Sequence, residues 1–140
     1  MSNNENRYNL KMWQGATFGM TITVKDANNA VQNLTGYSAR MQLRLSHDNP
    51  TAAESLSTSN GEIVIVPAEG NLILELAATR TANIPVDLSN EYPPKTSYVY
   101  DLELQDTNSK VSKLLYGIVV LIALLLPPFG NSKLRAQNRP

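Results

Sequence analysis

Four separate stretches of this chain alternate apolar and polar residues with a period of two, and no other feature constrains the fold as strongly. In Ser38 to Ser46, the residues Ala39, Met41, Leu43 and Leu45 are apolar and those between them are polar. Successive side chains of a β-strand point to opposite faces of a sheet, so each stretch predicts a strand with one buried face. The other three stretches are Thr17 to Val24, Asn71 to Ala77 and Ser97 to Gln105. The sequence therefore predicts an all-β protein.

Short polar segments lie between these stretches, where tight turns are needed. Asp26 to Asn29 and Asp106 to Ser109 are rich in residues whose side chains bond their own backbone in turns. Pro67 to Gly70 joins two apolar runs and predicts a hairpin connection. Thr79 to Ile84 has room for a single helical turn, and the small polar residues of His47 to Asn60 predict an exposed excursion.

Two further apolar segments, Tyr8 to Trp13 and Val111 to Leu121, raise the expected number of strands to about seven. Strands separated by short turns favour an antiparallel two-sheet sandwich. Pro85 to Thr96 has no alternation and predicts an extended crossing between the sheets. The 140 residues suit one domain, and we expect residues 1–120 to form it, followed by an extended apolar arm and a polar tail in residues 121–140.

Residues that carry chemistry are few and scattered. Twelve Lys and Arg balance twelve Asp and Glu, which argues against an electrostatic nucleic-acid partner. The chain has no cysteine, and its single histidine, His47, cannot alone build a nitrogen and sulfur metal site. Asp26, Asn28 and Asn29 resemble part of a calcium loop, but the glycine and closing glutamate of an EF-hand are missing. We expect His47 to be a loop residue and Asp26 a turn residue.

Two carboxylates and one tryptophan are the remaining candidates for a site. Asp101 and Glu103 share one face of an expected strand, about 6.5–7 Å apart, which could suggest a glycosidase pair. Cross-strand pairing with bases such as Arg40 and Arg44 is the simpler interpretation, and we favour it. Trp13 is expected in the core rather than on a ligand platform. The sequence therefore predicts no catalytic residue, no metal and no cofactor, and we do not expect an enzyme.

Six segments follow one another in an order and spacing that together carry a resemblance. They are Trp13 to Thr17, Asp26 in a turn, Leu34 to Arg44, Thr81-Ala82, Tyr100 to Leu104, and Val111 with Leu114, Leu115 and Gly117. Together they resemble small virion proteins of tailed bacteriophages, of the baseplate and tail-fibre-attachment type. The likeness extends to the N-terminal sandwich domain of the siphophage baseplate upper protein and spans roughly residues 10 to 120.

The resemblance implies a structural protein of the virion, a β-sandwich adaptor in the phage tail or baseplate. Such a protein presents surfaces to other virion structural proteins and to copies of itself, and it assembles in the cytoplasm of the bacterial host. Nucleic acid, membrane and small-molecule substrates are not expected as partners. A capsid decoration (cement) protein would suit a sandwich with extended arms equally well, and that alternative stays open.

The strand after Gly117 departs from the family's pattern because it continues as an apolar run. No charged residue lies between Lys113 and Lys133, and the uninterrupted apolar part is Leu114 to Leu126. As a helix this part would be about 20 Å long, against a hydrocarbon core of about 30 Å, and Pro127 would end it. A small tail-anchored membrane protein with a soluble β domain is therefore the less favoured class.

The end of the apolar run predicts a protein interface. A leucine-rich extension left in water would be a large exposed apolar patch, so we expect something to cover it. A neighbouring subunit is the favoured cover, through strand addition or a docked arm, and the domain's own surface is the alternative. The predicted interface residues are Leu121, Ile122, Leu124, Leu125, Leu126, Pro127, Pro128 and Phe129.

Overall fold

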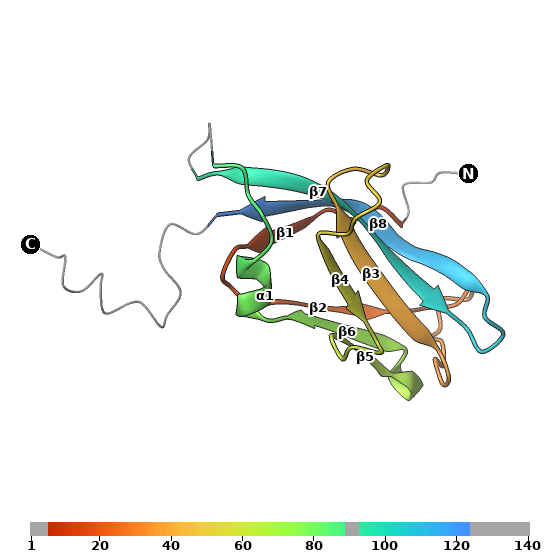
Figure 1. Ribbon diagram of the computed structural model, residues 1–140. Helices are drawn as coiled ribbons and strands as arrows, with labels where there is room; N and C mark the ends of the chain where they lie inside the picture. The colour runs from red at the N-terminus through yellow and green to blue at the C-terminus, as the bar shows by residue number, and fades with distance from the viewer. Residues whose placement is uncertain (1–5, 89–92, 124–140) are drawn as a thin grey trace, which may run out of the picture.

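The computed structural model describes residues 6–88 and 93–123, which form two β-sheets packed on each other (Figure 1). The five-stranded sheet contains, in spatial order, β1 (Leu10–Trp13), β8 (Val111–Ile122), β7 (Lys95–Gln105), β3 (Ser38–Arg44) and β4 (Glu54–Ser57). The three-stranded sheet contains, in spatial order, β2 (Phe18–Thr23), β6 (Asn71–Leu76) and β5 (Ile63–Val66). The predicted all-β sandwich is confirmed.

The five-stranded sheet is mixed rather than purely antiparallel. β1 runs parallel to β8, with Leu10 opposite Val119 and Met12 opposite Leu121. The other neighbouring strands of both sheets are antiparallel. Parallel strands need a long connection, and here most of the chain separates the two partners. The first and last strands of the described chain are therefore held side by side.

Inward-facing side chains of both sheets form one apolar core. On β7, Tyr98 and Tyr100 are among its largest buried side chains, as the alternation predicts. Their hydroxyl groups remain bonded, because Tyr100 donates to the carbonyl oxygen of Tyr8 at 2.6 Å and Tyr98 donates to that of Pro85. The core thus buries two phenols without leaving their polar ends unpaired.

The two Asp-rich turns form as predicted and share one geometry. The Asp26 carboxylate accepts backbone N–H groups from residues two and four positions later, and the Asp106 carboxylate does the same. Asn29 and Ser109, in equivalent places, have positive φ angles of 65° and 66°. The bonding capacity of Asp26 is directed at its own turn, which confirms it as a turn residue.

The expected hairpin and helical turn are also present. Pro67–Glu69 forms a single 3-10 turn between β5 and β6, and Gly70 follows in the left-handed conformation with φ of 65°. Helix α1 (Ala78–Ala82) follows β6 directly. Its buried Thr81 accepts from the N–H of Gly15 at 3.0 Å and thereby fixes the link between β1 and β2.

The structure differs from the sequence prediction in one strand. The segment 47–60 is not simply an exposed excursion, because it contains β4, which pairs with β3. Leu56 of this strand is fully buried. A four-residue strand with a single core residue leaves no periodic signal, which explains why the sequence did not reveal it.

Two apolar residues expected in the core lie at the surface. Trp13 is 44% exposed, because Leu10 and Met12 occupy the inward positions of β1 and leave Trp13 on its outer face. Leu45 is 56% exposed, because β3 ends at Arg44 and the next residue no longer follows the alternation. Both predictions were wrong for local reasons of strand phase and strand length.

Strand β8 extends past the expected domain boundary at residue 120. Leu121 and Ile122 belong to the strand, with β1 on one side and β7 on the other. Both side chains are buried, and so is Ala123, whose N–H donates to the carbonyl oxygen of Pro94 at 2.9 Å. The sandwich therefore reaches residue 123.

Candidate interaction surface

Among residues 6–88 and 93–123, the two open sheets have four edge strands, namely β1, β4, β2 and β5. An edge strand presents N–H and C=O groups that can pair with another chain unless the protein covers them. β4 and β5 lie on the same side of the sandwich, because β5 contacts β3, the neighbour of β4. The two edges differ in whether side chains cover them.

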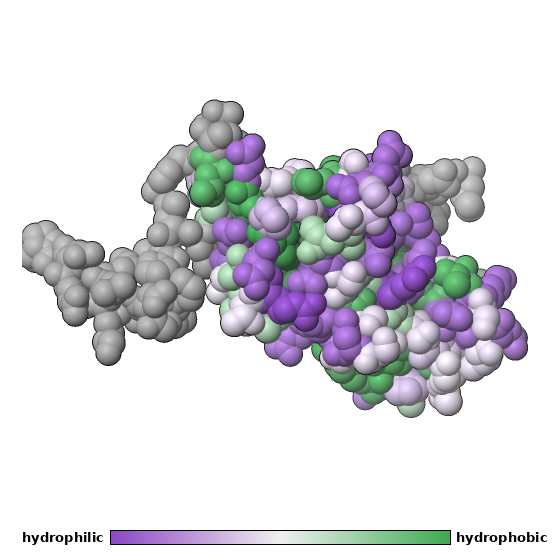
Figure 2. Space-filling model, viewed as in Figure 1, coloured by the Kyte–Doolittle hydropathy of each residue, from purple (hydrophilic) through white to green (hydrophobic). Residues whose placement is uncertain are grey.

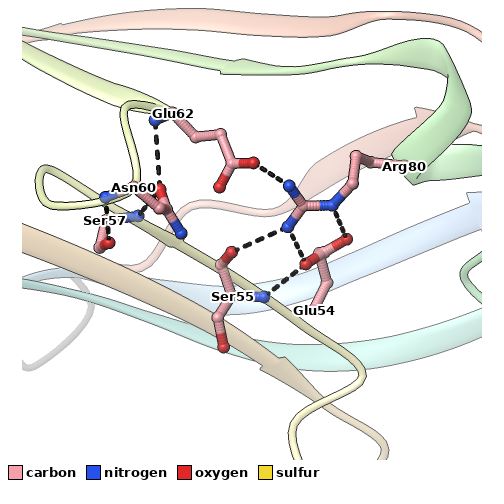
Figure 3. A network of polar contacts seen from close by, with 6 residues as sticks. All are labelled: Glu54, Ser55, Ser57, Asn60, Glu62 and Arg80. Atoms are coloured by element: carbon pink, nitrogen blue, oxygen red, sulfur yellow. Dashed lines mark hydrogen bonds and ion pairs between the residues drawn. The ribbon is translucent and has the colours of Figure 1, made fainter.

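Side chains close the outer edge of β4 (Figure 3). In its register with β3, the backbone groups of Ser55 and Ser57 point away from the sheet. The N–H of Ser55 donates to the Glu54 carboxylate at 2.8 Å, and the carbonyl oxygen of Ser55 accepts from Arg80 at 3.3 Å. The N–H of Ser57 donates to the Asn60 side chain at 3.0 Å. These contacts occupy groups that an added strand would need.

Arg80 is the centre of this cluster and connects three elements. It projects from α1, its Nε donates to Oε2 of Glu54 at 2.9 Å, and its Nη1 donates to Oε2 of Glu62 just before β5. The hydrogen bonds to Glu54 raise the pKa of Arg80 above its ordinary value, so the group stays charged. Oε1 of Glu62 is buried without a hydrogen-bond partner in the part of the chain that the structure describes. The cluster ties β4 and β5 to the helix.

The outer edge of β5 remains open. The N–H of Glu75 donates to the carbonyl oxygen of Glu62 at 2.9 Å, which fixes the phase of the β5–β6 ladder. In that phase Val64 bonds to β6, and the N–H and C=O groups of Ile63 and Ile65 point to the outer edge. Within residues 6–88 and 93–123, no hydrogen-bond partner is found for these groups.

An open apolar groove of about 360 Å³ follows this edge. Residues that line it include Leu34, Tyr37, Ile63, Val64, Ile65 and Pro67. Three consecutive residues of β5 alternate between the two faces of the sheet, so a hollow that touches all three must run along the edge. The groove therefore combines unpaired backbone groups with apolar walls.

The outer face of the three-stranded sheet continues the apolar surface of the groove. Val64 lies directly opposite Ile73 in the register of β5 and β6, and they are 51% and 40% exposed. Figure 2 shows green apolar side chains at the lower margin of the molecule, where Figure 1 places β5 and β6. Exposed apolar residues beside an open edge are the feature that most proteins avoid, and they mark this side for contact.

The outer face of the five-stranded sheet has a different character. Arg40 forms an ion pair with Glu103 at 2.9 Å across β3 and β7, which confirms the predicted cross-strand pairing. Asp101 pairs with Lys113 of β8 at 3.4 Å instead of Arg44, which donates to the backbone of the following loop. The two carboxylates are thus engaged with bases on neighbouring strands.

The remaining candidates from the sequence do not converge on a site. His47 is exposed in the loop after β3, at the rim of a shallow hollow of about 130 Å³ over the charged side chains of β3 and β7. Among residues 6–88 and 93–123, no group of three His, Cys, Asp or Glu side chains is arranged to hold a metal ion. The expectation that His47 is a loop residue is confirmed.

The predicted interface residues divide into two sets. Leu121 and Ile122 are buried in β8 of their own domain, so the prediction that they face a partner is corrected. The structural reason is that β8 continues between β1 and β7 to Ile122, which places Leu121 in the apolar core. The other six, Leu124, Leu125, Leu126, Pro127, Pro128 and Phe129, lie outside the described residues.

Comparisons with known proteins leave the family of this chain open. No protein-family model and no curated protein sequence matches it. In the described part of the chain, no helix has the length and apolar composition needed to cross a membrane.

Proposed function

We propose that this chain is a non-enzymatic structural protein of a tailed-phage particle, an adaptor of the tail or baseplate that joins virion proteins through subunit interfaces. The proposal rests on the resemblance of its segments and on the surfaces that the sandwich presents. A capsid decoration protein would use the same surfaces and differs in its place in the particle.

One observation carries the proposal, namely the way in which the sandwich ends. β8 is paired on both sides, and Leu121 already fills its place in the core. The sequence nevertheless continues after Ala123 with Leu124 to Phe129. A chain that adds six apolar residues to a completed strand has apolar surface to bury elsewhere, and burial against another subunit is the usual solution.

Contacts between distant segments give further support. Gln14 and Ala16 belong to the first segment of the resemblance, and Thr81 belongs to a later one. The Thr81 hydroxyl donates to the carbonyl oxygen of Ala16 at 2.8 Å. The N–H of Gln14 donates to the carbonyl oxygen of Ile122 at 2.8 Å. Two of the segments that suggest the family, Trp13 to Thr17 and Thr81-Ala82, are therefore in contact.

Most of the apolar run that a membrane anchor would need belongs to β8. Leu114 to Ile122 form the greater part of β8, so the uninterrupted apolar run that remains is Ala123 to Leu126. As a helix this remainder would be about 6 Å long, far short of a hydrocarbon core of about 30 Å. The observation favours a protein interface over a membrane anchor.

Quantitative mass spectrometry of purified phage particles tests the proposal. We expect the chain in the particles at a copy number that is a multiple of a tail or capsid symmetry. A chain that is absent from washed particles, and that stays with host membranes through high-salt and carbonate washes, would contradict it. Particles separated into capsids and tails distinguish the adaptor from the decoration protein.

A further inference from the structure

The β5 edge has the composition of a docking site that the described chain does not fill. The β4 edge, on the same side of the sandwich, is closed by Glu54, Asn60 and Arg80, whereas the groups of Ile63 and Ile65 are unpartnered among the described residues. The adjoining groove is apolar and open. Side chains close one edge of the sandwich and leave the other edge on the same side open. We infer that the open edge pairs with another segment.

We propose that the groove along β5 receives Leu124 to Phe129 of a second copy of this chain. This inference rests on the proposed function, in which the same segment docks on a subunit, and it adds the surface that receives it. The docked segment adds as a short strand to β5 and places its leucines against the walls of the groove.

The backbone groups on the two sides correspond. β5 offers the N–H and C=O groups of Ile63 and Ile65, which are two residues apart. The incoming segment offers three consecutive residues with N–H groups, Leu124 to Leu126, before Pro127. Three extended residues span the distance between two outward-facing positions of a strand, and the proline ends the pairing because it lacks a donor.

The charges on the two sides are opposite. Residues 62–76, which include β5 and β6, contain no Lys or Arg; of their three glutamates, Glu62 is paired with Arg80, and Glu69 and Glu75 supply the acidic charge. Residues 124–140 contain Lys133, Arg135 and Arg139 and no Asp or Glu. A basic tail that follows the docked leucines is attracted to an acidic sheet, and screening by salt weakens that attraction.

Geometry favours a second copy over the same chain. β8 is separated from β3 by β7, and β5 packs over β3 in the other sheet. Two strand spacings within the sheet and one spacing between the sheets lie at right angles, so the direct distance is at least about 14 Å. Roughly four extended residues are needed to span it. The apolar residues begin directly after Ala123. Within one copy, Leu124 to Pro127 would be needed to reach the groove and could not also fill it.

The contact is heterologous, because the tail of one copy enters the groove of the next. Contacts of this type produce a closed ring when the rotation between copies closes and an open chain when it does not. Each copy has one segment and one groove, so every copy in a ring can be fully engaged. This property suits an adaptor that works within a symmetric particle.

A peptide-binding experiment tests the inference. The full chain carrying Leu125→Asp has a disabled segment and an intact groove, and a fluorescently labelled peptide of residues 124–140 reports binding by anisotropy. We expect saturable binding that weakens as salt increases. The absence of binding to this variant would overturn the inference, even if the chain is found in purified particles.

Two further substitutions in the Leu125→Asp chain localise the contact. Val64→Lys places a charge at the open edge, and we expect peptide binding to weaken about tenfold or more. Leu45→Lys places the same charge at an exposed apolar residue after β3 that does not line the groove, and binding should change less than about threefold. Both positions are exposed, so both variants should keep the thermal unfolding of their parent.

The outcomes separate the inference from the proposed function. Equal binding to the Val64→Lys and Leu45→Lys variants would place the peptide elsewhere and overturn the groove, while leaving the adaptor role intact. A groove that binds the peptide in a chain that never enters particles would instead overturn the adaptor role. An unaltered full chain that stays monomeric at high concentration and excludes the peptide would mean that the segment occupies its own groove, which also overturns the inference.

Discussion

The carbonyl oxygen of Tyr8 occupies the space into which a side chain at Gly117 would project. A Cβ at position 117 would lie 2.5 Å from that oxygen, a distance that is shorter than any ordinary contact of a Cβ atom. The N–H of Ile118 also donates to the side chain of Asn9, at 3.1 Å, so the segment before β1 lies tightly on β8. The glycine is what permits the N-terminal segment to close over the last strand.

Gly117→Ala should therefore destabilise the fold by about 2–4 kcal/mol, because either the backbone near Tyr8 or β8 must shift. Gly19→Ala is the matched control, since a Cβ there would lie at an ordinary 3.7 Å from the carbonyl oxygen of Leu74. The control should change stability by less than about 1 kcal/mol. Urea unfolding measures both, and equal effects would show that the segment before β1 does not pack on β8 as described.

The two glutamates that contact Arg80 should differ in their contributions. Glu54→Gln removes the charge from a carboxylate that accepts two bonds from Arg80 and one from Ser55, and we expect a loss of about 2 kcal/mol. Glu62→Gln alters a group with one buried oxygen that has no partner among the described residues, so the loss should stay below about 1 kcal/mol. Thermal unfolding of the two variants would refute this if Glu62→Gln were the more harmful.

The position of the domain end gives a third prediction. A chain cut after Ala123 keeps every residue of β8 and, at a concentration where both chains are monomeric, should unfold with nearly the same midpoint as the full chain. A chain cut after Val120 loses the buried Leu121 and the pairing of Ile122 with Trp13, so it should lose about 3–5 kcal/mol. Similar denaturation midpoints for the two shortened chains would contradict the extension of β8.

Because Tyr100 is buried, we expect the stability of the fold to depend on pH in the alkaline range. Burial, with smaller contributions from Tyr8 and Asp101, raises the pKa of Tyr100 to about 12, and burial also raises that of Tyr98. The unfolded chain ionises first, at about pH 10, so stability is fully present below that pH and falls as pH rises toward 12. Denaturation at pH 9 and pH 11 should show this fall, and Tyr100→Phe should reduce it. An unchanged slope in the variant would assign the fall to other groups.

The sequence predicted the parts of the fold that depend on local pattern. Alternation in Ser38–Arg44 and Asn71–Leu76 decides which face is buried, and the Asp26 turn closes on its own backbone, so neighbouring residues suffice. The parallel pairing of β1 with β8 escaped prediction, because it joins residues from opposite ends of the described chain. The exposure of Trp13 was in principle readable, since Leu10 and Met12 already occupied the inward positions.

The interaction surface was only half visible in the sequence. The apolar residues after Ala123 stand out in any reading of the chain, but their receiving surface depends on which strands finish at a sheet edge. Ile63 to Val66 held the only local signal, four apolar residues in a row where one-sided burial needs alternate ones. The structure adds that β5 pairs with β6 on one side and ends the sheet on the other, which makes this run an open edge.

Sedimentation velocity of the full chain tests most directly whether the residues after Ala123 dock on another subunit. We expect a species larger than the monomer whose fraction grows with protein concentration, and we expect Leu125→Asp to return the protein to a monomer. Gln137→Asp, with the same change of charge in the polar tail, should leave the larger species in place. A full chain that sediments as a monomer at every concentration, with or without the substitution, would contradict this docking.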